Sequence, residues 1–125
     1  MTERVSYDAE ITDLGIAGYH LRKPVPVRIY TLPGAHDPWI VDDQVRMKAS
    51  EHGLDEREAV VRWCWGACWL HTALESKEPL RSEGQRQCLA VLREYIRRDA
   101  DAPEVPEFSG LCKCQPQWRL LRERG

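Results

Sequence analysis

The stretch of residues 63–71 constrains the fold more than any other part of the chain, because it carries no formal charge. It holds three of the five tryptophans and two of the five cysteines in a sequence of 125 residues. A helix that is apolar all round has to be buried on most of its sides. We therefore predict that this stretch is a central core helix, around which the rest of the chain packs.

Two capping-box patterns set the limits of the helices in this region. Asp55 and Glu58 form the first pattern, which predicts a helix over residues 56–75. Ser82 and Gln85 form the second pattern, which predicts a helix that continues to about residue 98. The apolar face of this second helix is expected to pack against the first.

A further helix is predicted ahead of these two. Asp42 or Asp43 can cap a helix that runs through residues 45–48. Gly53 stands where a left-handed C′ residue would end such a helix. Together with the capping boxes, this makes residues 42–99 the helical part of the chain, with about three helices.

Alternating apolar and polar residues predict strands near the N-terminus. The alternation is clear over residues 4–11 and 25–31, and weaker over residues 16–21. Pro24 and Pro26 cannot donate to a strand ladder, so the 25–31 strand is expected to be an edge strand or to start late. Residues 1–35 are therefore predicted to form a small antiparallel sheet.

The C-terminal part, residues 100–125, is predicted to be an extended or irregular tail. It contains three prolines, which oppose regular helix, and only residues 118–123 suggest a last helical turn. The chain length corresponds to one domain, residues 1–125. The predicted fold class is thus α+β, with a small N-terminal sheet, helices around the Trp- and Cys-rich helix, and an irregular tail.

Charge and cysteine usage narrow the class of protein. The net charge is −2, from 18 basic and 20 acidic residues, which argues against a nucleic-acid-binding face. The longest apolar run has eight residues, whereas a membrane helix needs about 20. An odd number of cysteines favours reduced thiols and a cytoplasmic location. Arginine outnumbers lysine 14 to 4, which suggests a GC-rich source such as an actinobacterium or its phage.

The cysteines and one histidine form the first candidate site. Cys64, Cys68 and His71 follow one another at i, i+4 and i+7, which places them on one stripe of a helix. Cys88 lies on the next predicted helix, and Cys112 and Cys114 form a C-x-C pair in the tail. Four such ligands could hold zinc, the one cofactor this donor set suggests. The alternative is that the thiols pack as small hydrophobic groups and bind nothing.

The same helix allows a third interpretation. The run from Cys64 to His71 resembles the helical, peroxidase-associated AhpD-like disulfide reductases, in which a pair of cysteines precedes a histidine. That resemblance covers eight residues and implies thiol redox chemistry. This chain departs from the pattern, because three residues rather than two separate Cys64 from Cys68.

Tryptophan and arginine indicate a surface for a protein partner, since both are enriched at interface hot spots. The residues that we single out are Trp39, Trp65, Trp69, Trp118, Arg119 and Arg122. The last three belong to a locally basic W-R-L-L-R segment that either docks a partner or packs Trp118 and Leu121 on the body.

The leading functional hypothesis is a small, non-catalytic interaction or regulatory protein. The sequence has no nucleophile-elbow, phosphate-loop, dinucleotide-binding or H-E-x-x-H motif. The helix after Gly53 opens with Asp55, Glu56 and Glu58, which would repel DNA phosphates. A zinc-binding or thiol-redox protein is the alternative hypothesis.

Overall fold

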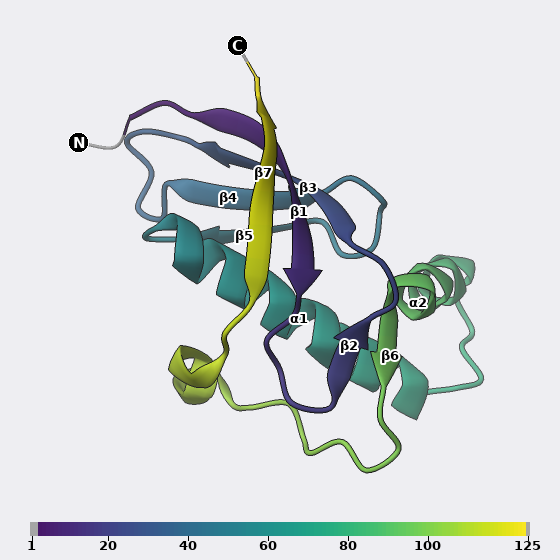
Figure 1. The fold of residues 1–125 in the computed structure, drawn as a ribbon. Coiled ribbons are helices and arrows are strands. Elements are labelled where there is room, and N and C mark those ends of the chain that lie inside the picture. Colours follow the sequence, from purple (N-terminus) through teal and green to yellow (C-terminus); the bar gives the residue numbers. More distant parts are fainter. Residues whose placement is uncertain (1–2, 125) are drawn as a thin grey trace.

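The computed structural model describes residues 3–124, except for the side chains of Phe108, Ser109 and Cys112. These residues form an α+β fold with one five-stranded sheet, one two-stranded sheet and two α-helices (Figure 1). The elements are β1 (Ser6–Asp13), β2 (Tyr19–Leu21), β3 (Val25–Thr31), β4 (Trp39–Asp43), β5 (Ser50–Gly53), α1 (Glu56–Ser76), α2 (Glu83–Tyr95), β6 (Ile96–Arg98), the 3-10 helix η1 (Phe108–Lys113) and β7 (Gln117–Glu123). Within this part of the chain, no helix is both long enough and apolar enough to cross a membrane.

The large sheet joins the two ends of the chain. Its strand order is β5-β4-β3-β1-β7, and every neighbouring pair is antiparallel. The last strand, β7, lies beside the first, β1, with Trp118 opposite Ile11 (Figure 1). The pairing of β1 with β7 shifts register after Asp8, which adds one residue to β7 at Leu121. Because β7 stands last in the strand order, it is an edge strand of the sheet.

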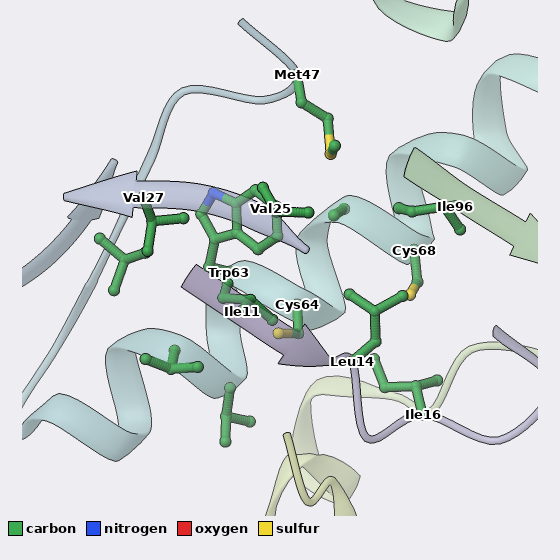
Figure 2. Packing of buried hydrophobic residues seen from close by; sticks show 14 of the residues in the cluster. Ile11, Leu14, Ile16, Val25, Val27, Met47, Trp63, Cys64, Cys68 and Ile96 are labelled. Atoms are coloured by element: carbon green, nitrogen blue, oxygen red, sulfur yellow. The ribbon is translucent and has the colours of Figure 1, made fainter. Parts of the chain in front are cut away.

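Helix α1 covers one face of this sheet and supplies the centre of the core. Trp63, Cys64 and Cys68 are fully buried and lie among side chains from β1, β3 and β6 (Figure 2). The prediction of a buried Trp- and Cys-rich central helix is confirmed for this face of α1. Its opposite face departs from the prediction, because Trp69 is 54% exposed.

The helix predicted over residues 42–53 is wrong, because this segment is a strand, a loop and a second strand. Asp43 ends β4, and its carboxylate accepts hydrogen bonds from the backbone N–H groups that follow. The donors are Val45 and Met47 to Oδ1, and Lys48 and Ala49 to Oδ2, at 2.8–3.2 Å. Arg46 and Ala49 have positive φ angles of 57° and 106°, which a helix cannot contain.

Gly53 also has a different role from the predicted helix end. It lies in β5, and a Cβ at this position would stand 2.4 Å from the backbone nitrogen of Ala59 in α1. Glycine is needed here because β5 and the first turns of α1 approach each other at backbone distance. Both helix starts were predicted correctly, since Asp55 accepts from the Glu58 N–H and Ser82 accepts from the Gln85 N–H.

Three other boundaries differ from the predictions. Strand β3 lies between β1 and β4, so it is not an edge strand. Helix α2 ends at Tyr95, because residues 96–98 pair with β2 instead of continuing the helix. The tail is more regular than predicted, since it contains η1 and then β7 in place of a last helical turn. The tail forms a strand because its last residues pair along the backbone of β1.

Candidate functional site

Three of the five cysteines gather on the buried side of α1. Cys64, Cys68 and the tail residue Cys114 are all buried. Burial raises the pKa of the Cys64 and Cys68 thiols far above the ordinary value, and the neighbouring Cys114 raises both pKa values further. Figure 2 shows Cys64 and Cys68 among Leu14 and Ile16. The tail therefore meets the helix at these thiols, which are poor nucleophiles in this setting.

The other predicted ligands lie elsewhere. The Cys88 thiol lies 3.2 Å from the Met47 carbonyl oxygen, to which it donates. His71 lines a pocket between α1, α2 and β6. Cys112 lies outside the side chains that the structure describes. Among the described residues, no group of three or more His, Cys, Asp or Glu side chains is arranged to hold a metal ion.

The structure brings two of the predicted partner-binding tryptophans together. Trp39 from β4 and Trp118 from β7 line one open pocket of about 470 Å³. The pocket lies where the ends of β1, β4 and β7 meet the start of α1. Its other lining residues are Arg4, Val5, Ser6, Tyr7, Glu56, Leu120, Glu123 and Arg124.

Glu56 holds the aromatic wall of this pocket in place. Its Oε1 accepts a hydrogen bond of 2.6 Å from the Trp118 indole nitrogen. The Tyr7 hydroxyl also donates to Glu56, and the pKa of Tyr7 is raised by burial and by this carboxylate. Sequence reasoning missed Glu56 and Tyr7, although Glu56 occupies the first turn of a predicted helix, where carboxylates are favoured.

The strand that borders the pocket has an unpaired edge. None of the described strands pairs with the outer edge of β7. Leu120 and Leu121 on this strand are 54% and 53% exposed. Residues 117–123 do not alternate strictly, because Leu120 and Leu121 are consecutive, so the sequence suggested a last helical turn instead of this strand.

The arginines of β7 are occupied by neighbours on β1. Arg119 pairs with Glu10, and Arg122 lies 3.0 Å from Asp8. Hydrogen bonds from Arg122 and Arg124 lower the pKa of Asp8. The predicted role of Arg119 and Arg122 as partner contacts is untested, and these pairs show that both side chains help to hold β7 in the sheet.

The remaining two predicted tryptophans lie away from this pocket. The Trp65 indole nitrogen donates to the Pro106 carbonyl oxygen at 2.6 Å, which fastens the tail to α1. Trp69 borders a separate hollow with Thr72, Ser76 and Arg98. The candidate functional site is thus the edge of β7 with the Trp39–Trp118 pocket.

Comparisons with known proteins give no information about this site. The chain matches no model of a protein family, no curated protein and no solved structure. Its function has to be inferred from the geometry of its own residues.

Proposed function

We propose that this protein is a non-catalytic interaction module that binds an extended segment of a partner protein along β7. The observation that carries the proposal is that an unpaired seven-residue edge strand lies directly beside an aromatic pocket. In strand addition, main-chain hydrogen bonds supply affinity and a side-chain pocket supplies specificity. Both parts are present in one place here.

The outer edge of β7 is only partly protected, because the bulge at Leu121 interrupts the strand near its end. Natural edge strands carry charges or prolines that block pairing with other chains. In β7 the charges of Arg119 and Arg122 are neutralised by Glu10 and Asp8 of the neighbouring strand. The exposed side chains of Leu120 and Leu121 remain, and these favour pairing.

The chemistry of the pocket describes the partner segment. Its walls, Trp39, Trp118 and Leu120, suit an apolar side chain. Arg4, Arg124 and Glu123 at the pocket suit a polar backbone and charged flanks. The ligand is therefore an extended peptide with an apolar anchor. A cytoplasmic setting and an accessory role in a phage or actinobacterium remain part of this proposal, based on composition alone.

The test is selection of displayed random peptides on the purified full-length protein, followed by affinity measurement. The selected peptides are expected to share an apolar anchor. Leu121→Lys should weaken their binding at least tenfold, because it places a charge on the pairing edge. Leu32→Lys is the matched control, since Leu32 is similarly exposed (48%) but lies outside β7 and the pocket. Its affinity should equal that of the wild type.

Two results would contradict this proposal. The first is that Leu121→Lys and Leu32→Lys bind the selected peptides equally well. The second is a dimer that is seen by sedimentation equilibrium in the wild type and that dissociates in Leu121→Lys. The chain that pairs with β7 would then be a second copy of this protein.

A second candidate function is a zinc site formed by thiols. What favours it is the presence of Cys114 from the tail near Cys64 and Cys68, where it raises the pKa of both, although these described side chains are not arranged to hold a metal ion in this structure. Zinc would deprotonate these thiols and bind the tail to α1.

Elemental analysis of protein purified without a metal-binding tag tests this second candidate. One zinc ion per chain is expected, together with a lower melting temperature after addition of a chelator. Cys88→Ser is the control, and it should keep the same zinc content, because the Cys88 thiol donates to the Met47 carbonyl oxygen and lies apart from the other thiols. A zinc content near zero, with a melting temperature unaffected by chelator, rejects the metal site.

A further inference from the structure

A second pocket, lined by residues of α1, α2 and β6, has an unusual composition. It has a volume of about 330 Å³ and lies between α1, α2 and β6. Its lining residues are Arg22, His71, Glu75, Arg93, Ile96, Arg97, Arg98, Asp99 and Ala100. Four of these nine residues are arginines, so the charge balance of the pocket decides what it can hold.

Two of the four arginines are paired and two are not. Arg93 bonds to Glu75 and Glu78, and Arg97 bonds to Asp99 at 2.7 Å. Arg22 donates instead to the Arg93 carbonyl oxygen at 3.0 Å, and it forms no ion pair with any of the described residues. Arg98 likewise has no described carboxylate, and its guanidinium lies 5.9 Å from the centre of the Tyr19 ring. Arg22 and Arg98 therefore give the pocket an excess of positive charge.

The buried histidine in this pocket is an independent sign of a ligand. His71 is only 3% exposed, and its Nδ1 has no hydrogen-bond partner among the described residues. That atom lies 3.3 Å from a Glu75 oxygen, close enough for an ion pair but without hydrogen-bond geometry. A buried polar atom without a partner destabilises the fold. With the ring proton on Nδ1, an acceptor oxygen of a bound anion would supply the missing partner.

We propose that this pocket binds a phosphate dianion, either free or as the monoester of a small molecule. Planar guanidinium groups bond to two oxygens at once and match phosphate geometry. Arg22, Arg98 and His71 approach from different elements, which suits a tetrahedral anion better than a planar carboxylate. The volume is within the range of small-molecule sites.

A neighbouring hollow allows the source of the phosphate to be determined. It has a volume of about 360 Å³, shares Arg98 with the anion pocket, and is bordered by the exposed Trp69. An aromatic base attached to the phosphate could stack on this indole. Adenosine monophosphate would then bind more tightly than inorganic phosphate, whereas glycerol phosphate would not.

The experiment is titration of the full-length protein with inorganic phosphate at low ionic strength, followed by calorimetry and by NMR of the His71 ring nitrogens. Binding should change the Nδ1 signal. Arg98→Gln and Arg22→Gln should each weaken binding at least tenfold. Both arginines are exposed, so these variants are expected to fold. Arg81→Gln is the matched control, because Arg81 is exposed and lies outside the described pockets.

The results separate specific binding from general attraction to positive charge. Equal weakening in Arg81→Gln, or saturation without any change at His71, overturns the proposal. Unchanged affinity in both Arg22→Gln and Arg98→Gln overturns it as well. Tighter binding of adenosine monophosphate that is lost in Trp69→Leu identifies a nucleotide monoester, and equal affinity identifies free phosphate. None of these results depends on peptide binding at β7.

Discussion

Replacing Asp43 by alanine is expected to lower the free energy of unfolding by about 4 kcal/mol, because hydrogen bonds to a charged group contribute roughly 1.5–3 kcal/mol each and are not fully additive. The Asp43 carboxylate accepts from four backbone N–H groups between Val45 and Ala49. Two residues of that loop, Arg46 and Ala49, have positive φ angles. Without the carboxylate, the four hydrogen bonds that hold this backbone conformation are lost.

Urea unfolding of matched variants measures this effect. Asp43→Asn should lose about half as much stability as Asp43→Ala, because the amide keeps one acceptor oxygen and its nitrogen cannot accept. Asp42→Asn is the control, since the neighbouring carboxylate accepts from a single side chain, the Tyr30 hydroxyl. A loss below about 1 kcal/mol in Asp43→Ala, the contribution of one ordinary hydrogen bond, would show that the loop does not depend on this carboxylate.

The same residue explains why the sequence predicted a helix here. A side chain that accepts from the N–H groups ahead of it is typical of both helix caps and loops. The choice between them depends on the pairing of β4 with β3 and β5, which no local pattern contains. The capping boxes at Asp55 and Ser82 could be predicted, because each acts within three residues of the chain.

The tail was misread for a related reason. Residues 118–123 suggested a last helical turn, whereas the arginines of this segment bond to Asp8 and Glu10 of β1, more than 100 residues away. The conformation of the segment is set by those distant carboxylates. The sequence could therefore identify Trp118 as unusual but could not place it at the edge of a sheet.

The candidate sites show the same limit. Composition singled out Trp39 and Trp118, and the sheet brings them to one pocket. The pocket proposed to bind an anion takes Arg22, His71 and Arg98 from three segments that lie far apart in the sequence. Sequence reasoning found the unusual residues, and only the fold could show which of them meet.

Gly53→Ala is the second substitution with a large expected effect, a loss of about 3 kcal/mol in the free energy of unfolding, at the upper end of the cost of overpacking. The added Cβ would stand 2.4 Å from the Ala59 nitrogen and 2.9 Å from the Ala59 Cα. Both are backbone atoms of α1, so β5 and the helix have to move apart. Movement at this end of α1 also displaces Glu56, which orients Trp118.

Two other glycines provide matched controls for this substitution. At Gly84 the nearest atom to an added Cβ is 3.6 Å away, so Gly84→Ala should raise stability by about 0.5 kcal/mol by restricting the unfolded chain. At Gly66 the close atoms belong to the flexible end of the Lys48 side chain, which can move aside, so Gly66→Ala should change the free energy of unfolding little.

Urea unfolding compares all three variants. Equal stability of Gly53→Ala and Gly84→Ala would contradict the close approach of β5 to α1. Peptide affinity should fall in Gly53→Ala alone, because only this contact bears on the position of Glu56 beside the β7 pocket.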